Sequence, residues 1–507
     1  MLYFVVFGSG AMLMSLEMVG SRILAPYFGT SIFVWGSLIG VFLGALSIGY
    51  FLGGALSDRA PRTEVLAAVL VASGATVAVI PLVSTPVQAW ILGRDPGPQL
   101  GPLLACMALF FVPSVFMGMV SPYAIKLKAR DLDRVGNIAG RLYGISTFGS
   151  ILGTLATSFY LIPALGVQAI IRSLGAGLMG LGLLALVSAG ARRRTQWAAV
   201  AALICLVLLT PAAVSPAGPG RVVYEAQTLY HQIYVVDSEG VRYLKFNNSF
   251  QGGMLLDDPY QSSFPYADYF HLSLVFNPEI KNVLVVGLGG GMAPKRFHRD
   301  YPHMSIDAVE IDPVVVRVAR QYFHVPEDDR LRLFAQDGRQ FVQKTDQRYD
   351  LVILDAYYAD SIPFHLTTVE FFREVKACLN PGGVVAFNMI GAVEGRSSKL
   401  FRTMHRTFQT VFPHLYSFPI GMAQDGQTGS IRNVIVFGTA SDALGGGGRG
   451  VLVARMRLLA ASRVSIKGFE GFAADFWEKV ILYDDVEALT DDHAPVDTLL
   501  HVYRQPW

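Results

Sequence analysis

Residues 281–312 read KNVLVVGLGGGMAPKRFHRDYPHMSIDAVEID. The apolar run 283–286 leads into the glycine-rich run 287–291, and a second apolar run, 306–309, ends at Glu310. This order predicts a strand, a glycine loop, a helix, a second strand and an acid at its tip. Glycines accept positive φ and let backbone N–H groups approach a ligand without a Cβ in the way. The acid is then placed to accept hydrogen bonds from a ribose diol, as in doubly wound nucleotide-binding folds.

The same alternation of strands, loops and helices continues along the chain. A third strand precedes Gln336-Asp337-Gly338, and a fourth precedes Leu354-Asp355. The predicted strands are 283–286, 306–309, 331–335, 350–354, 384–388 and 433–437, and the predicted helices are 266–276, 313–322, 367–379 and 399–411. Alternating strands and helices predict a parallel sheet with both faces covered.

A smaller β region comes before this part of the chain. Residues 221–251 alternate with period two around the turn Ser238-Glu239-Gly240, which predicts a small antiparallel sheet of hairpins. The Pro, Gly, Ala and Ser run at 210–220 predicts a linker. We therefore expect three parts: a transmembrane helical domain at 1–214, a linker and small β domain at 215–265, and a Rossmann-like domain at 266–507.

Composition separates the first 214 residues from the rest. Hydrophobic residues make up 52% of the 507 residues, charged residues only 16%, and the mean hydropathy is +0.41. These values are too apolar for a soluble enzyme throughout. The apolar residues form segments near the ~20 residues that cross a ~30 Å hydrocarbon core. We expect a multi-pass protein of the cell (inner) membrane, in contact with the lipid bilayer through seven spans: 1–19, 32–57, 64–84, 100–125, 142–165, 169–189 and 197–214.

Small residues recur at four-residue spacing in the predicted spans. The series are Gly36, Gly40 and Gly44, then Gly140 and Gly144, then Gly149 and Gly153. Such faces let helices pack closely in lipid. Glu17 and Arg22, in or beside the first span, either hold the bundle together, by pairing with each other or with Arg141, or line a substrate path.

Charge and cysteine content exclude some classes of function. A net charge of +2, without a basic run interleaved with aromatics, excludes nucleic acid as a partner. Cys106, Cys205 and Cys378 are far apart, in apolar contexts and without metal-type spacing. We expect them to be buried hydrophobic side chains and expect no metal.

Taken in chain order, the motifs resemble those of the spermidine synthase family of polyamine aminopropyltransferases. They are Tyr230-His231-Gln232-Ile233, the strand and loop at 283–291, Val309 to Pro313, Gln336 to Gly338, and Leu354-Asp355 through Pro363. Residues 221 to about 438 fit that family's plan of a small β domain followed by a methyltransferase-like Rossmann domain. With the multispan part, including 20–30 and 49–59, the chain resembles the membrane-fused branch of the family.

The resemblance implies a nucleoside donor and roles for individual residues. Glu310 would bind the ribose hydroxyls of decarboxylated S-adenosylmethionine, Asp337 would accept from the adenine amino group, and Gly338 would keep that turn close. Asp355 would hold and deprotonate the attacking amine, the alternative being an Asp that caps the loop after its strand. The other implied site residues are Asp360 as a second carboxylate, Gly287, Gly289, Gly291 and Pro363 at the nucleoside, and His231, Gln251, Tyr266, Asp268 and Tyr357 at the substrate.

Four features depart from the family pattern. Gly290 replaces an Asp of the glycine loop that binds the amine of the decarboxylated donor, and Tyr266-Ala267-Asp268 replaces a Tyr-His-Glu triplet. His231 replaces a Gln, and the gap between Asp355 and Asp360 is longer. A diamine needs anions at both ends, so the case for putrescine as acceptor is weaker. Without the loop Asp, the carboxylate of intact S-adenosylmethionine is not repelled, which keeps methyl transfer open.

Three functions follow. The first is transfer of an aminopropyl group from decarboxylated S-adenosylmethionine to a small polyamine-type amine. The second is an S-adenosylmethionine-dependent methyltransferase acting on a lipid or membrane-near substrate, with Asp355 or Tyr357 as base. The third is a transporter or sensor whose nucleoside domain only binds. The first leads because of the family resemblance, and a homodimer through the soluble domain is a further expectation.

Loop charges bear on the side of the membrane at which the soluble part lies. Basic residues gather between spans two and three, four and five, and six and seven: Arg59, Arg62, Lys126, Lys128, Arg130, Arg134, Arg192, Arg193 and Arg194. The positive-inside rule assigns these loops to the cytoplasm, so a seventh span delivers residue 221 onward to the outside. An S-adenosylmethionine-type ligand is instead expected in the cytosol. The charge count favours the outside.

Overall fold

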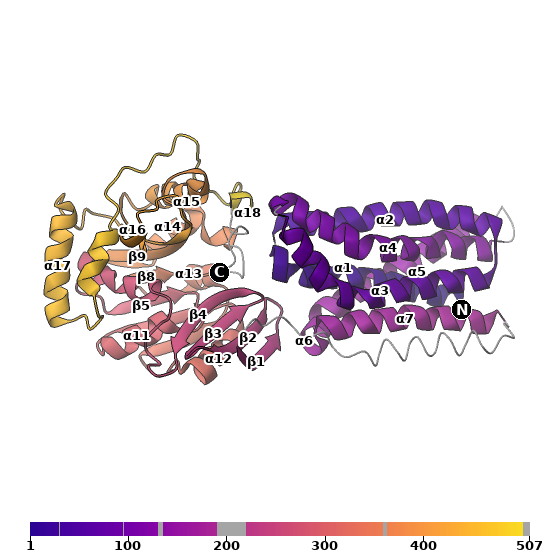
Figure 1. Ribbon diagram of the computed structural model, residues 1–507, viewed down its shortest axis with the longest axis horizontal. Coiled ribbons are helices and arrows are strands. Elements are labelled where there is room, and N and C mark those ends of the chain that lie inside the picture. Colours follow the sequence, from indigo (N-terminus) through magenta and orange to yellow (C-terminus); the bar gives the residue numbers. More distant parts are fainter. Residues whose placement is uncertain (30, 95, 130–134, 190–219, 358–361, 500–507) are drawn as a thin grey trace. The chain divides into compact units, whose positions relative to one another are not determined.

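The computed structural model describes residues 1–29, 31–94, 96–129, 135–189, 220–357 and 362–499. The chain forms two compact units, Met1–Pro216 and Ala217–Gln505. In Figure 1 the described part of the first unit consists of helices, whereas the second combines helices with two sheets. The division lies within the linker expected at 210–220, most of which is outside the described residues.

Long apolar helices build the first unit. They are α1 (Leu2–Phe28), α2 (Ile32–Arg59), α3 (Thr63–Leu92), α4 (Gly97–Lys128), α5 (Val135–Ala156), the π-helix η2 (Thr157–Leu161), α6 (Ile162–Leu165) and α7 (Val167–Ser188). Among the described residues, five helices are long and apolar enough to cross a membrane: Leu2–Phe28, Ile32–Arg59, Thr63–Leu92, Gln99–Lys128 and Val167–Ser188.

Five of the seven expected spans correspond to these five helices. The first begins as expected but runs on to Phe28 instead of ending at residue 19. The segment expected to span at 142–165 is not among the five, and there α5 is followed by a π-helix and the short α6. The expected span at 197–214 lies outside the described residues. The count of seven therefore stays a prediction.

The glycine spacing identifies close helix packing at some positions and not at others. Within the described part of the chain, the expectation is not met for five glycines, because no neighbour lies within 4 Å of where a Cβ would stand: Gly36, Gly40, Gly44, Gly140 and Gly144. Gly149 and Gly153 do lie against the backbone of α1, and Gly49 and Gly53 lie against the backbone of α4. The reason is that a four-residue repeat marks one stripe of a helix but does not say whether a neighbour faces that stripe.

The second unit begins with the expected small antiparallel sheet. Its strands, in the order β1-β2-β3-β4, are β1 (Arg221–Gln227), β2 (Gln232–Ser238), β3 (Val241–Phe246) and β4 (Ser249–Leu255). Glu239 and Gly240 both have positive φ, 51° and 79°, between β2 and β3. Two successive positive φ angles suit a tight hairpin because their twist matches that of the paired strands.

A seven-stranded sheet follows, in the order β10-β11-β9-β8-β5-β6-β7. The strands are β5 (Asn282–Val286), β6 (Ser305–Glu310), β7 (Leu331–Ala335), β8 (Tyr349–Leu354), β9 (Leu379–Gly391), β10 (His414–Pro419) and β11 (Arg432–Thr439). The five strands from β9 to β7 are parallel, as expected. The expectation of a wholly parallel sheet is wrong for β11, which is antiparallel to β9 and β10. The sequence did not predict β10. Strands β10 and β11 pair as a hairpin, and the two strands of a hairpin run in opposite directions.

Helices cover both faces of this sheet. They are α9 (Tyr266–Tyr269), α10 (Ser273–Phe276), α11 (Met292–Asp300), α12 (Pro313–Phe323), α13 (Gly338–Lys344), α14 (Val369–Ala377), α15 (Lys399–Gln409), α16 (Met422–Asp425), α17 (Gly448–Ser462) and α18 (Val496–Leu499), with short 3-10 helices at η3 (Phe270–Leu272), η4 (Phe364–Leu366), η5 (Arg396–Ser398) and η6 (Phe469–Asp475). Figure 1 shows α14 and α15 on one side of the sheet and α11, α12 and the small sheet on the other.

Side chains of the central strands alternate between two hydrophobic cores. One core contains residues of the small sheet, α10, α11, α12 and α17, and the other contains residues of α13, α14 and α15. Ile353 of β8 and Ala386 of β9 belong to the first core. Because side chains two apart share a face, Asp355 and Asn388 follow on the side of the small sheet. The fold thus brings the end of β8 and the end of β9 toward the same crevice.

Candidate active site

The glycine loop lies where the strand order reverses, since β5 has β6 on one side and β8 on the other. In open α/β sheets, ligands bind at the carboxyl ends of the strands at this point. Gly287, Gly289 and Gly291 all have positive φ, of 95°, 51° and 64°. A Cβ on Gly287 would run into the backbone of Asp355, so the loop after β5 and the loop after β8 touch here. Both loops therefore border one crevice.

Glu310 ends β6 directly beside the glycine loop. Its Oε2 accepts hydrogen bonds from the backbone N–H groups of Leu288, at 3.2 Å, and Gly289, at 3.4 Å, and its Oε1 accepts from the N–H of Asp312 at 3.1 Å. The side chain is only 8% exposed. Burial raises the pKa of Glu310, while the three N–H donors act against that rise. The carboxylate is thus held rigidly at the loop by main-chain groups.

Asp337 lies at the end of the neighbouring strand, β7. Its Oδ1 caps α13 by accepting from the N–H of Gln340 at 2.9 Å, and its Oδ2 lies 3.2 Å from Nε2 of His365. A Cβ on Gly338 would press on the side chain of Val286, which explains the glycine after the acid. Asp337 and Glu310 therefore stand on adjacent strand ends, with Asp337 less buried.

Asp355, immediately after β8, is surrounded by uncharged donors. Asn388 Nδ2 donates to its Oδ1 at 2.8 Å, and the Tyr266 hydroxyl also donates to the carboxylate. Burial raises the pKa of Asp355 to about 7, although both hydrogen bonds lower it. A carboxylate with a pKa near neutral accepts a proton and releases it at physiological pH, which is the property a general base needs.

Two further side chains complete the surroundings of Asp355. The Tyr357 hydroxyl donates to the backbone carbonyl of Asn388, and Asn433 Nδ2 donates to Asn388 Oδ1 at 2.9 Å. Burial and the neighbouring Asp355 raise the pKa values of Tyr266 and Tyr357 well above the usual tyrosine range. Both hydroxyls therefore remain protonated hydrogen-bond donors.

The small sheet covers the glycine loop from one side. The backbone carbonyl of Gln251 is 3.6 Å from where a Cβ of Gly289 would stand. His231 is buried and stacks on Phe246, with ring centroids 4.1 Å apart. Burial raises the pKa of Tyr230, with smaller contributions from the carboxylates of Asp312, Asp337 and Glu310. The Tyr230 hydroxyl is therefore within electrostatic range of these three carboxylates.

The loop that carries Tyr230 is fixed to the large sheet by a side-chain hydrogen bond. Thr228 Oγ1 donates to Asp312 Oδ2 at 2.6 Å and accepts from the N–H groups of Tyr230 and His231 at 3.1 and 2.9 Å. Asp312 also caps α12 by accepting from the N–H of Val314. The two sheets therefore share a buried polar contact beside the crevice.

The remaining predicted site residues have different positions. Pro363 is buried at the start of η4, next to His365. Burial raises the pKa of Asp268, and its charged neighbours are Arg296 and Asp300 of α11, whereas the neighbours of Tyr266 are Asp355 and Tyr357. Asp360 lies outside the described residues. The fold thus brings Tyr266 and Tyr357 to Asp355 and directs Asp268 toward α11.

Sequence reasoning missed four residues that border the crevice: Tyr230 as a site residue, His365, Asn388 and Asn433. Asn388 ends an apolar run on β9, and a polar residue at the carboxyl end of a buried parallel strand is a usable signal. Asn433 carries no such signal, because its strand is antiparallel and the crevice lies at its amino end.

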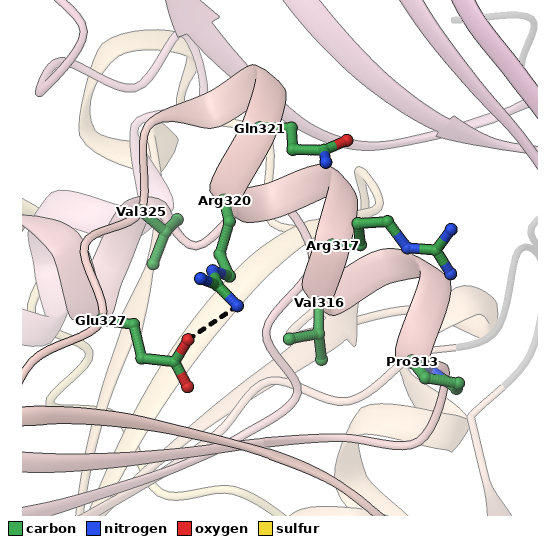
Figure 2. Close-up of a pocket in the computed structure, with 7 residues that line it drawn as sticks. All are labelled: Pro313, Val316, Arg317, Arg320, Gln321, Val325 and Glu327. Carbon is green, nitrogen blue, oxygen red and sulfur yellow. Dashed lines mark ion pairs between the residues drawn. The ribbon is translucent and has the colours of Figure 1, made fainter.

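A hollow of about 580 Å³ lies along α12 (Figure 2). It is lined by Pro313, Val316, Arg317, Arg320, Gln321, Val325 and Glu327. Arg320 and Glu327 form an ion pair of 2.8 Å across it. None of the predicted site residues lines this hollow, so we place the candidate site at the glycine loop. Among the described residues, no group of three His, Cys, Asp or Glu side chains is arranged to hold a metal ion.

The strand order, the glycine loop and the acid after β6 define the class of the second unit: a Rossmann-like, methyltransferase-type domain preceded by a small antiparallel sheet. Residues 265–431 match the spermine/spermidine synthase domain. A polyamine aminopropyltransferase of Vibrio vulnificus (strain CMCP6) is 33% identical over 228 residues, which cover 43% of this chain and 73% of that protein.

Two further proteins show similarity. An eEF1A lysine and N-terminal methyltransferase homolog of Drosophila melanogaster is 31% identical over 140 residues, covering 26% of this chain and 21% of that protein. The crystal structure of a probable spermidine synthase from Corynebacterium glutamicum ATCC 13032 matches with a TM-score of 0.42 and 19% identity, covering 54% of this chain and 97% of that one.

The chain belongs to the spermidine synthase family of polyamine aminopropyltransferases. The family resemblance found from the motifs is therefore confirmed, and the enzyme is of the aminopropyltransferase type. The helical first unit lies outside residues 265–431, which match the family domain.

Proposed function

We propose that this enzyme transfers an aminopropyl group from decarboxylated S-adenosylmethionine to a small polyamine-type amine at the crevice between the glycine loop and Asp355. The observation that carries the proposal is the Asp355 carboxylate, which has a pKa of about 7 and lies between two uncharged donors beside a glycine loop. An amine nucleophile must be neutral, and a carboxylate of that pKa can take its proton near neutral pH.

The nucleoside side of the crevice fits an adenosine thioether. Glu310 and Asp337 stand on neighbouring strand ends at the carboxyl edge of the sheet, where doubly wound folds bind nucleotides. Gly287, Gly289 and Gly291 keep side chains out of the space above β5. We assign Glu310 to the ribose, Asp337 and Gly338 to the adenine, and Pro363 to the wall of the base pocket.

The chemistry at Asp355 follows from its surroundings. When bound, the donor supplies an electrophilic methylene carbon attached to a positively charged sulfur. Asp355 takes a proton from the acceptor ammonium, and the freed nitrogen lone pair attacks that carbon as the C–S bond breaks. The electron pair of the broken bond stays on sulfur, so methylthioadenosine leaves uncharged. Tyr266 and Tyr357 orient the amine through their hydroxyl groups.

The residues that would bind the acceptor differ from the family pattern. The loop acid is Gly290 and the triplet histidine is Ala267, so two groups that would bind a donor amine or a diamine are missing. Asp268 has Arg296 and Asp300 as its charged neighbours. Gln251 and His231, on the covering sheet, and Asp360 as a second carboxylate remain candidates. We expect Asp360→Asn to raise the acceptor KM more than it lowers kcat.

The test uses the full chain in detergent micelles, with decarboxylated S-adenosylmethionine and a panel of diamines and polyamines. Release of methylthioadenosine together with an aminopropylated amine, abolished in Asp355→Asn, supports the proposal. Calorimetry with the decarboxylated and the intact donor provides the second arm. If the protein binds intact S-adenosylmethionine more tightly than the decarboxylated form, aminopropyl transfer is rejected. If it binds neither compound, only the function as a transporter or sensor is left.

Methyl transfer is the second candidate because of Gly290. The loop there carries no acid that would repel the carboxylate of intact S-adenosylmethionine, and the Drosophila melanogaster relative is named as a methyltransferase homolog. As a methyltransferase, the protein described here would act on a lipid or a membrane-near group. A Cβ at position 290 would lie 3.3 Å from the ring of Phe323, so Gly290→Asp needs only a small shift of that ring. If Gly290→Asp weakens intact donor binding without affecting the decarboxylated donor, the glycine sets donor choice.

For the first unit we propose seven spans of the cell (inner) membrane. With the basic loops in the cytoplasm, an odd number of spans places the α/β unit on the side of the membrane that faces away from the cytoplasm. The basic loops carry this proposal. Alkaline phosphatase and green fluorescent protein fused after Gly220 test it in a bacterial host. A fluorescent, phosphatase-silent fusion puts the α/β unit in the cytosol and rejects the seven-span count. We also propose domain boundaries at residues 214 and 265, which limited proteolysis tests. A homodimer through the α/β unit is proposed as well, and analytical ultracentrifugation tests it.

A further inference from the structure

We propose that Asn388 and Asn433 form a relay of side-chain amides that orients Asp355 for proton transfer. The inference deepens the proposed function and rests on it. Asn433 Nδ2 donates to Asn388 Oδ1 at 2.9 Å, and Asn388 Nδ2 donates to Asp355 Oδ1 at 2.8 Å. Neither asparagine touches the reacting atoms directly, so both are positioning residues.

The sheet itself aligns the three side chains. Asn433 of β11 pairs in register with Ile390, and Asn388 of β9 pairs with Ile435, so the two asparagines are diagonal neighbours on one face. Asp355 follows β8, the parallel strand on the other side of β9. Three adjacent strands thus contribute one polar side chain each. The contact depends on the register of the antiparallel hairpin, which gives β11 a role beyond closing the sheet.

The relay has a direction. A side-chain amide has one accepting oxygen and one donating NH2 group. Because Asn433 donates into the oxygen of Asn388, the NH2 group of Asn388 is the end that faces Asp355. If the Asn388 amide turned over, its oxygen would face the Asp355 carboxylate and its NH2 group would face the NH2 group of Asn433. Both new contacts are unfavourable, so Asp355 and Asn433 together favour the observed orientation of Asn388.

Asn388 connects the groups around Asp355. Its side chain is 2% exposed, and its backbone carbonyl accepts from the Tyr357 hydroxyl. The groups that face Asp355 in the described part of the chain are therefore Tyr266 from α9, Tyr357 from the loop after β8, and Asn388 from β9. The hydrogen bond from Asn388 acts against the burial that raises the pKa of Asp355. Losing it raises that pKa further, and the base is then ionised only at higher pH.

The experiment measures the acid limb of the kcat/KM profile of the full chain in detergent. Asn388→Ala should move the limb up by about one pH unit, the scale of one lost hydrogen bond to a charged group. For a base with a pKa near 7, that shift lowers kcat/KM at pH 7 about five-fold and leaves it within about two-fold of wild type at pH 9. Asn433→Asp, which keeps the side-chain volume but cannot donate when ionised, should move the limb in the same direction.

Two controls separate positioning from folding. Asn282→Ala removes an exposed asparagine at the opposite end of the same sheet, on β5, and should leave the profile unchanged. Asn433→Leu removes the donor without adding a charge and should produce a smaller shift than Asn433→Asp. Binding of methylthioadenosine should stay at the wild-type level in all four variants, because none of these side chains faces the nucleoside acids.

A direct titration makes the result independent of turnover. Carbon-13 NMR of labelled aspartate carboxyls, assigned by comparison with Asp355→Asn, reports the titration of Asp355 without any substrate. An upward shift in Asn388→Ala and Asn433→Asp supports the relay even if no amine is turned over, in which case only the proposed function fails. The relay is rejected if the Asp355 midpoint and the acid limb stay at their wild-type values in both variants.

Discussion

Glu310 and Asp355 are both carboxylates at strand ends beside the same glycine loop, but different groups stabilise them. Glu310 accepts hydrogen bonds from three main-chain N–H groups, whereas Asp355 accepts from the side chains of Asn388 and Tyr266. Burial raises the pKa of both, and that of Asp355 reaches about 7.

The difference matches the two roles that we propose, nucleoside binding for Glu310 and proton transfer for Asp355. Main-chain donors are part of the loop and cannot turn away, so they hold the Glu310 carboxylate in one place. The donors to Asp355 are uncharged side chains, and burial outweighs them, which leaves the pKa of Asp355 at about 7. A proton can then move onto and off Asp355 at little cost, which suits catalysis better than permanent ionisation.

The largest effect should come from removing the charge of Asp355. Asp355→Asn should lower kcat by about 10²–10⁴-fold, the usual contribution of a general base. Binding of methylthioadenosine should stay close to wild type, because the proposed function assigns Asp355 to the acceptor and Glu310 and Asp337 to the nucleoside. Single-turnover kinetics and calorimetry on the same preparation measure the two quantities. A wild-type rate in Asp355→Asn would show that another residue is the base.

The same variant should stabilise the fold at alkaline pH. The pKa of Asp355 is higher in the folded state than in the unfolded chain, so ionisation destabilises the fold progressively from about pH 4 upward and reaches its full effect above pH 7. Asp355→Asn removes that penalty and should add ~2–4 kcal/mol at pH 8 but little near pH 4, the lower value allowing for partial exposure. Thermal unfolding midpoints at the two pH values measure it, and an equal change at both would contradict the raised pKa.

Glu310 provides the matching test on the binding side. Glu310→Ala should weaken methylthioadenosine binding by roughly 1.5–3 kcal/mol, the scale for hydrogen bonds to a charged group. The value of kcat at saturating donor should change little. Glu327→Ala, in the segment after α12 and paired with Arg320, is the control and should bind normally. If Glu310→Ala instead lowers kcat and leaves affinity intact, the division of roles between the two carboxylates is wrong.

Asp337 should show the smallest effect of the three acids. Asp337→Asn keeps a side chain that caps α13, so folding is preserved while the negative charge beside His365 is lost. We expect donor affinity to fall by about 0.5–1.5 kcal/mol, the range for one ordinary hydrogen bond. Competition between adenosine and inosine thioethers measures it. An unchanged preference for adenine would show that Asp337 only caps the helix.

The local features of the α/β unit were predictable from the sequence. The positive-φ glycines of the loop, the acid that ends β6 and the Asp after β8 follow from patterns a few residues long, because strand periodicity and glycine conformation are local properties. The small antiparallel sheet and the five parallel strands were predicted on the same basis. The strand β10 and the antiparallel direction of β11 were not, since they depend on which edge of the sheet a distant hairpin joins.

In the membrane part, sequence spacing marked stripes but not their partners. Gly149 and Gly153 pack against a neighbouring helix, whereas Gly36, Gly40 and Gly44 do not, although the spacing is the same. The spacing of glycines along a helix is set by the sequence of that helix alone. Whether a second helix packs against those glycines depends on the sequence of both helices.

What the sequence by itself determined is the order of elements, the glycine loop and the identities of Glu310, Asp337 and Asp355, because each is written in a short run of adjacent residues. Only the tertiary structure decided that Asn433, far along the chain and on an antiparallel strand, orients Asn388, and that Asn388 donates to Asp355. It also decided that the charged neighbours of Asp268 are Arg296 and Asp300, while Tyr266 in the same short helix donates to Asp355. The physical reason is that strand register and sheet order set these contacts, and both result from the packing of segments that are distant in the chain.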